Sequence, residues 1–252
     1  MSVISVSGAE RPLGRDGHRV RSRSIKAGDC TILRVTDLKR YDLRARGLTP
    51  DEEREVAALL SEGALVIYPT DTLYAIGCRA LDGAAVARLR AAKGREADKP
   101  LPVIVADVDQ VRSLAARWPA AAQRLADSFW PGPLTLVIPA APALPAELLT
   151  GAGTIAVRVP ASEIARALAR LAGPLVSTSA NLAGEAPCVT VDQATAAFPL
   201  ATLAFDVGPL DGAPSTIVEM GGPDGRPKVL REGRIGRQVI EDVLRGWVAG
   251  TP

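Results

Sequence analysis

The sequence predicts a mixed α/β (α+β) fold in which one large twisted sheet is flanked by helices. Apolar runs of strand length, such as 64–68, alternate with segments of helical periodicity, such as 83–92. The last three predicted strands lie between residues 203 and 231 without helices between them, which argues against a purely parallel sheet. A chain of 252 residues, 47% hydrophobic and 23% charged, can bury the core that such a fold needs.

Each element has a local signal. The first helix follows Thr49, an N-cap residue type, with Pro50 at its first position, and Gly63 ends it. Ser162 caps a later helix, which Gly173 stops. Helices are predicted over 52–60, 83–92, 108–116, 120–129, 162–171, 191–198 and 236–247. Strands are predicted over 64–68, 102–106, 134–138, 154–159, 175–177, 203–207, 215–220 and 228–231.

The composition argues against several classes of protein. The three cysteines, Cys30, Cys78 and Cys188, have no CxxC spacing, which argues against a zinc site or a disulfide framework. The single histidine, His18, lies in a polar stretch, which argues against a Ser-His-Asp triad. The longest apolar runs fall short of the roughly 20 residues that cross a bilayer, and the N-terminus has no signal core. We therefore expect a reduced, cytoplasmic protein that does not associate with a membrane.

The charge is distributed unevenly along the chain. Residues 1–50 hold 11 Lys and Arg against 5 Asp and Glu, whereas the remainder holds 19 against 23. We expect a basic, mobile N-terminal extension over residues 1–45. Two interpretations are open: an extension that is only solvated, and one that makes weak contact with RNA or another acidic partner. A single folded domain is predicted over residues 46–252.

Three cations, Lys93, Arg95 and Lys99, lie within seven residues between a predicted helix and the next strand. Cations near a helix C-terminus complement the helix dipole, so a purely structural role is one interpretation. The other interpretation is a triphosphate clamp, in which Arg supplies a bidentate fork and Lys a point charge.

Polar side chains also follow two apolar strands. Ser177–Asn181 supplies hydroxyls and an amide after the strand 175–177, and such side chains form turns or hold phosphate oxygens. Thr72 and Tyr74 follow the strand 64–68, where they either belong to a turn or lie at the rim of a ligand pocket. Arg158 lies in a strand made otherwise of apolar residues and Thr154, so it must be paired or bind an anion. These segments contain no obvious protein nucleophile.

Taken together, these segments resemble the YrdC family of threonylcarbamoyl-AMP synthases, in its single-domain form. The resemblance spans residues 52–236, in order and at family-like spacing. It rests on Pro69–Tyr74, Lys93–Arg95 with Lys99–Leu101, Trp130–Thr135, Ala156–Pro160, Ser177–Asn181, Ser215–Val218 and Leu230–Arg231.

The resemblance implies a fold with a deep basic cavity. It also implies an enzyme that joins L-threonine, bicarbonate and ATP into threonylcarbamoyl-AMP and releases pyrophosphate. A separate transferase would then use this product for threonylcarbamoyladenosine modification of tRNA. Mg²⁺ is expected with ATP, without a dedicated protein site for it.

The same resemblance assigns roles to individual residues. ATP would contact Arg95, Lys99, Thr154, Ser179, Cys188 and Arg231. Threonine would contact Thr72, Tyr74, Arg158, Ser177 and Ser215. The catalytic tetrad would be Lys93, Arg95, Ser179 and Asn181.

Two of the departures from the family pattern keep alternatives open. Ala75 stands where a Gly is common, and Ile104 stands where some members have a His at the threonine site. A YrdC-like paralogue that uses another amino acid or carbamoyl substrate is therefore one alternative. An RNA-binding module is another, although three residues each of Phe, Tyr and Trp offer few stacking platforms.

Overall fold

The computed structural model describes residues 38–94, 101–150, 152–182, 184–221 and 226–245. All of these residues belong to one compact unit, Val35–Pro252. None of the described helices is long and apolar enough to span a bilayer. His18, Cys30 and most of the predicted N-terminal extension lie outside the described residues.

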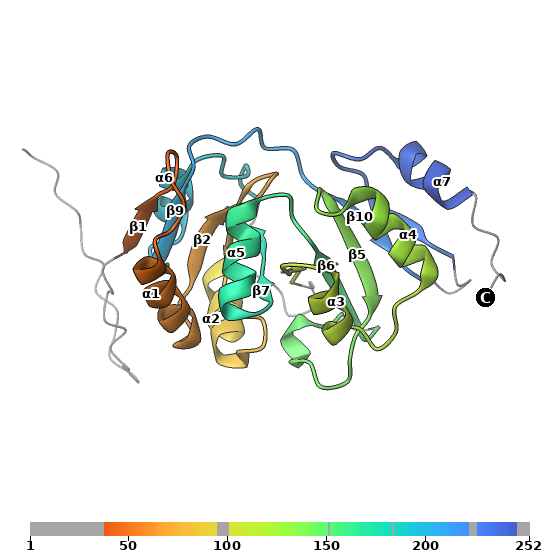
Figure 1. Cartoon of the computed structure of the whole chain (residues 1–252), viewed down its shortest axis with the longest axis horizontal. Helices are drawn as coiled ribbons and strands as arrows, with labels where there is room; N and C mark the ends of the chain where they lie inside the picture. Colours follow the sequence, from red (N-terminus) through yellow and green to blue (C-terminus); the bar gives the residue numbers. More distant parts are fainter. Residues whose placement is uncertain (1–37, 95–100, 151, 183, 222–225, 246–252) are drawn as a thin grey trace, which may run out of the picture. The chain divides into compact units, whose positions relative to one another are not determined.

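The described strands form two mixed sheets (Figure 1). The first sheet has the order β1 (Lys39–Asp42), β9 (Leu203–Asp206), β2 (Val66–Pro69), β3 (Tyr74–Gly77) and β8 (Thr178–Ser179). The second has the order β11 (Lys228–Arg231), β10 (Thr216–Glu219), β5 (Leu134–Pro139), β6 (Thr154–Arg158), β4 (Val103–Ile104) and β7 (Leu175–Val176). Parallel pairs such as β10–β5 lie beside antiparallel pairs such as β5–β6, so the predicted mixed class is confirmed.

The segment 175–179 belongs to both sheets. Its first part, β7, pairs with β4 in the second sheet, and its last part, β8, pairs with β3 in the first. The antiparallel pairing of Ala75 with Ser179 continues in an isolated bridge between Arg79 and Leu175. The single large sheet of the sequence prediction is thus two sheets that share one segment.

Gly77 lies at this junction of the sheets. The Val176 N–H donates to the Cys78 carbonyl over 2.9 Å, which brings the two backbones together next to Gly77. A Cβ atom added at Gly77 would stand 1.9 Å from the Val176 carbonyl oxygen. Only glycine fits this close approach.

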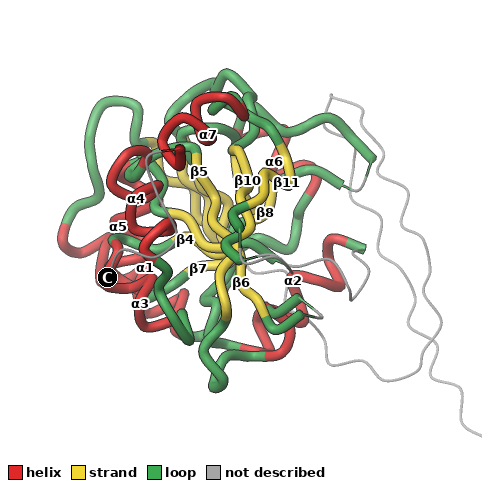
Figure 2. Tube along the Cα trace, turned by 90° about the vertical axis from the view of Figure 1, so that its right-hand side faces the viewer, coloured by secondary structure: helices red, strands yellow, loops and turns green. Residues whose placement is uncertain are grey.

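Helices cover the outer faces of the sheets, and Figure 2 shows the strands inside and the helices around them. The helices are α1 (Pro50–Ser61), α2 (Gly83–Lys93), α3 (Val108–Leu114), α4 (Ala120–Phe129), α5 (Glu163–Ala172), α6 (Val191–Ala197) and α7 (Arg237–Arg245), with a 3₁₀ turn at Ala146–Leu148. Thr49 and Glu52 form a capping box on α1, and Ser162 caps α5, as the sequence predicts for both caps. Helix α5 contacts β2 of the first sheet and β4 and β7 of the second, so it packs across the junction (Figure 1).

Strand β1 lies within the segment that sequence analysis assigned to the N-terminal extension. It pairs in parallel with β9, and the Tyr41 ring stacks on Phe205 with centroids 5.2 Å apart. The Tyr41 hydroxyl donates to Glu55 over 2.9 Å. Residues 39–42 are therefore part of the folded unit, which begins earlier than residue 46. The charged sequence of β1 lacks the apolar alternation that would have predicted a strand.

The buried side chains form two clusters. The larger cluster includes Leu89 and Val157 and packs α2 and α4 against the sheets. The smaller cluster, with Leu60, Leu168 and Phe205, packs α1 and α5 against the first sheet. These clusters fix the backbone from which the polar side chains of the site project.

Candidate active site

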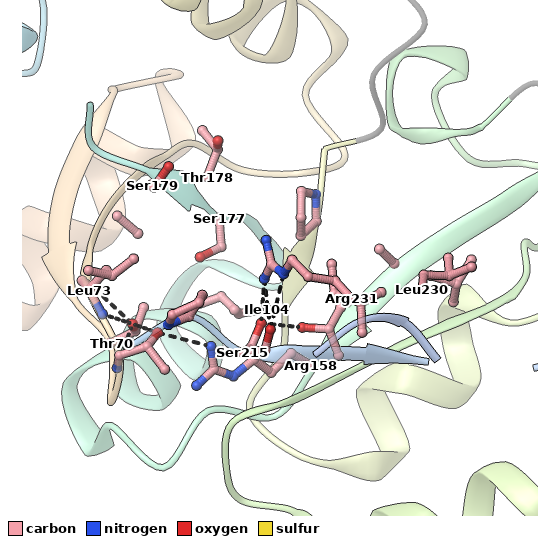
Figure 3. A pocket seen from close by; sticks show the side chains of 18 of the residues that line it. Thr70, Leu73, Ile104, Arg158, Ser177, Thr178, Ser179, Ser215, Leu230 and Arg231 are labelled. Atoms are coloured by element: carbon pink, nitrogen blue, oxygen red, sulfur yellow. Dashed lines mark hydrogen bonds between the residues drawn. The ribbon is translucent and has the colours of Figure 1, made fainter. Parts of the chain in front are cut away.

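A cavity of about 650 Å³ is lined by residues of both sheets (Figure 3). Most of the predicted site residues line it: Thr72, Tyr74, Thr154, Arg158, Ser177, Ser179, Asn181, Ser215 and Arg231. Apolar side chains such as Ile104, Val137 and Leu230 form the rest of the wall. Figure 3 shows Arg158, Ser215 and Arg231 grouped together, with Ser177 and Ser179 in the upper part of the view. The topology therefore gathers into one cavity side chains that are far apart in the sequence.

The turn between β2 and β3 is built by the hydroxyl of Thr70. This oxygen accepts from the N–H groups of Thr72 and Leu73 over 3.1 and 3.0 Å. It also lies 2.8 Å from the hydroxyl oxygen of Thr72. A threonine hydroxyl that bonds the following backbone is typical of a tight turn, and here it fixes Asp71 and Thr72 at the cavity.

Arg158 is the most buried charged group of the cavity, with 6% of its surface exposed. Its Nε donates to the Gly132 carbonyl over 2.9 Å, and its Nη1 donates to the Thr72 hydroxyl over 3.2 Å. Its Nη2 donates to the Asp71 carboxylate over 2.6 Å. Burial lowers the pKa of Arg158 from its ordinary value, while Asp71 opposes that shift. Of the two alternatives that the sequence left for this arginine, pairing or anion binding, the structure shows a pair with Asp71.

Arg231 supplies the second cation of the lining. Its Nη2 donates to the Ser215 carbonyl over 2.8 Å and to the Ser215 hydroxyl over 3.2 Å. The Ser215 hydroxyl lies 3.0 Å from that of Thr135. Burial lowers the pKa of Arg231 from its ordinary value. Among the described residues that line the cavity, Arg158 and Arg231 are basic and Glu219 is acidic, so the lining carries a net positive charge.

Lys93 is not among the residues that line the cavity. Its ammonium donates to the carbonyl oxygens of Ser179 and Asn181 over 2.7 and 2.5 Å and lies 5.4 Å from the Phe198 ring centroid. The Asn181 amide donates within its own loop, and its Oδ1 has no hydrogen-bond partner in the described part of the chain. Lys93 thus holds the backbone of the loop whose side chains line the cavity.

The remaining predicted residues differ in where they lie. Tyr74 lines the cavity, and its hydroxyl donates to the Gly208 carbonyl over 2.8 Å, so its proton already has an acceptor within the protein. Cys188 is buried beside the lining residue Pro187, and burial raises the pKa of its thiol. Arg95 and Lys99 lie outside the described residues, so their part in a phosphate clamp stays a prediction.

Sequence analysis missed several residues that line the cavity or bond to its lining. Asp71, Thr135, Thr150 and Glu219 belong to the cavity or to its hydrogen-bond network. The polar residue within the apolar strand 134–138 was a signal for Thr135, because an inward-facing hydroxyl in such a strand needs a partner. In the described part of the chain, no cluster of three or more His, Cys, Asp or Glu side chains could hold a metal ion.

Comparison with known proteins identifies clear relatives. A family model named for Sua5, YciO and YrdC, and described as "Telomere recombination", matches residues 58–233. The threonylcarbamoyl-AMP synthase of Bacillus subtilis is 39% identical over 195 residues, which cover 75% of this chain and 56% of that protein. The threonylcarbamoyl-AMP synthase of Chromohalobacter salexigens is 42% identical over 181 residues, covering 68% of this chain and 94% of that protein.

Solved structures agree with these relatives. The crystal structure of Pyrococcus abyssi Sua5 complexed with L-threonine matches with a TM-score of 0.76 at 36% identity, covering 82% of this chain and 61% of that one. Escherichia coli YciO matches with a TM-score of 0.71 at 24% identity, covering 81% of this chain and 98% of that one. The second likeness concerns the fold alone.

Proposed function

Because the chain belongs to the Sua5/YciO/YrdC family, we propose that it is a threonylcarbamoyl-AMP synthase, which condenses L-threonine, bicarbonate and ATP and releases pyrophosphate. The observation that carries this proposal is the set of side chains around one cavity: two arginines, Arg158 and Arg231, and the hydroxyls of Ser177, Ser179 and Ser215. Guanidinium groups and hydroxyls are donors for carboxylate and phosphate oxygens. The cavity volume of about 650 Å³ suits small ligands.

We assign the amino acid to the part of the cavity around Arg158. Its guanidinium pairs with the threonine carboxylate, while Thr72 and Ser215 bind the hydroxyl or the amine. The phosphates of ATP lie toward Arg231 and Ser179. The other predicted contacts, from Lys93, Tyr74, Arg95, Lys99, Thr154, Ser177, Asn181 and Cys188, stay predictions.

The reaction needs no protein nucleophile. Bicarbonate takes up a proton and loses water, which gives CO₂. The threonine amine adds to the carbon of CO₂ and loses a proton, which gives a carbamate. A carbamate oxygen then attacks the α-phosphorus of ATP, and the bond from that phosphorus to the pyrophosphate oxygen breaks. The protein contributes positioning and charge stabilisation. Holding the reactants in place can lower the barrier by about 7–11 kcal/mol.

We propose that Mg²⁺ arrives with the phosphates of ATP. Glu219 is the carboxylate that lines the described cavity, and one carboxylate together with phosphate oxygens is a usual magnesium environment. The residues present fit that arrangement better than a cage made of protein groups alone. When bound, the ion would neutralise charge on the departing pyrophosphate.

Pyrophosphate release from ATP by the purified chain tests the proposal. We expect release that requires both threonine and bicarbonate, and an adenylate product with the mass of threonylcarbamoyl-AMP. Binding of ATP without turnover on any acceptor would contradict the synthase assignment and favour an RNA-binding module. Arg158→Ala should raise the threonine requirement more than the ATP requirement.

One observation supports a second candidate, a synthase that uses another amino acid. Ile104 lines the cavity, and its register in β4 places it opposite Arg158 of β6. An apolar residue beside the proposed carboxylate site can contact the amino-acid side chain and help to select it. Pyrophosphate release with an amino acid other than threonine, and none with threonine, would favour this candidate.

The proposed reaction implies partners beyond the substrates. A tRNA threonylcarbamoyl transferase must consume the adenylate, since this chain is proposed only to make it. We propose that both act in the cytoplasm. We also propose that the basic N-terminal extension, predicted over residues 1–45, contacts RNA. A filter-binding comparison of the full chain with a chain that begins at residue 38, and so keeps β1, tests this.

A further inference from the structure

We propose that Asp71 is a positioning residue that holds Arg158 in the orientation in which its guanidinium receives the carboxylate of the amino-acid substrate. This inference rests on the proposed function, because it concerns the group to which we assign the threonine carboxylate. Asp71 makes no assigned contact with either substrate. The evidence for its role is the set of hydrogen bonds that Arg158 makes.

Three contacts in different directions fix the Arg158 guanidinium. They run from Nε to the Gly132 carbonyl (2.9 Å), from Nη1 to the Thr72 hydroxyl (3.2 Å) and from Nη2 to the Asp71 carboxylate (2.6 Å). Within the described residues, these contacts leave one N–H on each terminal nitrogen. Two N–H groups on neighbouring nitrogens of a planar fork can hold one carboxylate in a bidentate manner.

Asp71 is itself held firmly enough to set this orientation. The Thr70 hydroxyl accepts from the two N–H groups that follow Asp71 in the turn, those of Thr72 and Leu73. The main-chain carbonyl of Asp71 accepts from Arg234 over 3.2 Å. The Asp71 side chain is 15% exposed, so water competes little for its carboxylate. A short charge-assisted contact on a fixed backbone restricts the rotation of the guanidinium.

Charge neutralisation is the competing explanation for the same pair. A buried guanidinium is costly unless an anion lies close to it, and Asp71 supplies one. In that case the negative charge of Asp71 matters and its position matters less. A nearby carboxylate also weakens the attraction of Arg158 for a second carboxylate, so removal of the charge would alter threonine binding.

Two substitutions separate position from charge. Asp71→Asn keeps an oxygen acceptor at the same place and removes the charge. Asp71→Glu keeps the charge and moves the carboxylate by one methylene. Both variants leave Arg158 with a hydrogen-bond partner, so both are expected to fold. Asp192→Asn, which alters an exposed carboxylate on α6 outside the cavity, is the matched control.

Calorimetric titration of each variant with threonine, threonine amide and ATP gives the readout. We expect Asp71→Glu to raise the threonine Kd about tenfold or more, because displacement of a positioned group by about 1 Å has effects of that size or larger. Its preference for threonine over threonine amide should fall, and its ATP Kd should not change. Asp71→Asn should keep the threonine Kd within about threefold of wild type, since its acceptor stays in place.

A threonine Kd that changes at least as much in Asp71→Asn as in Asp71→Glu would overturn the positioning role in favour of charge. Equal losses of threonine and ATP binding would also overturn it, because they would indicate a general structural defect. Wild-type protein that binds no threonine would instead overturn the proposed function, and this inference with it.

Discussion

Replacement of Lys93 by methionine tests whether this lysine positions the loop 179–181 or contacts a ligand. The ammonium donates to the carbonyl oxygens of Ser179 and Asn181 over 2.7 and 2.5 Å, and only 7% of the residue surface is exposed. Methionine keeps an unbranched side chain of similar length and removes every N–H donor. The two carbonyls would then lose their charged partner while the apolar packing is largely kept.

The expected destabilisation follows from these contacts. A hydrogen bond to a charged group contributes about 1.5–3 kcal/mol, so the loss of two removes about 3–6 kcal/mol. Part of this loss is offset, because methionine does not pay the several kcal/mol that desolvation of a buried ammonium costs. We expect the free energy of unfolding to fall by about 2–4 kcal/mol.

Urea unfolding followed by circular dichroism measures this change, and pyrophosphate release at varied ATP concentration measures its functional effect. The control is Lys39→Met, which removes an exposed lysine paired with Glu55 and should cost no more than about 1 kcal/mol. We expect Lys93→Met to lower both stability and turnover, since the loop that carries Ser179 and Asn181 loses its anchor. Stability equal to that of the control, combined with loss of ATP binding, would refute the positioning role and indicate a direct ligand contact.

Three further predictions concern selectivity, pH and the N-terminal boundary. Ile104→Ala should reduce the kcat/KM preference for threonine over serine about tenfold, because a pocket contact with the extra methyl group of threonine contributes about 1–3 kcal/mol. An unchanged ratio would mean that this methyl group does not contact Ile104. Burial acts to raise the pKa of Asp206, but hydrogen bonds from Arg40 and a backbone N–H hold it below its ordinary value. This carboxylate therefore stabilises the fold above its unfolded pKa of about 3.9, and the contribution is lost as the pH falls through the native value. Asp206→Asn should make the urea midpoint less dependent on pH in the acid range. An unaltered dependence on pH would contradict a stabilising role for the Arg40–Asp206 ion pair. A chain that begins at residue 46 should be about 2–4 kcal/mol less stable than one that begins at residue 38, because it lacks β1 and its buried aromatic ring, and equal urea midpoints would contradict this.

The fold class and most elements could be predicted because their signals are local. The predicted helix 120–129 and the predicted strand 228–231 coincide with α4 and β11. Strand β3 was missed because Tyr74–Gly77 is short and follows a turn motif, and its pairing with β2 gives it its conformation. The division into two sheets depends on which strands the segment 175–179 joins, and such long-range pairing has no local signal.

The sequence predicted which side chains belong to the site better than it predicted their partners. Arg158 could be singled out because a guanidinium in an apolar strand requires a partner. The partners themselves, Asp71 and the Gly132 carbonyl, lie in loops far from Arg158 in the sequence, so only the fold could identify them. The family resemblance grouped Lys93 with Ser179 and Asn181, and the structure brings these residues into contact. Their contacts with Lys93 could not be predicted in detail, because the acceptors are main-chain carbonyls, which every residue type has.

The crowded backbone at Gly77 also limits how this protein can evolve. A methyl group there would collide with the Val176 carbonyl, and relief of the collision would push apart the strands that position Ser177 and Ser179. A mutation at residue 77 would therefore impair catalysis without altering any side chain of the cavity. At Gly77, any other residue adds the Cβ atom that causes this collision. We expect glycine here in every active descendant that keeps the crossing between the two sheets.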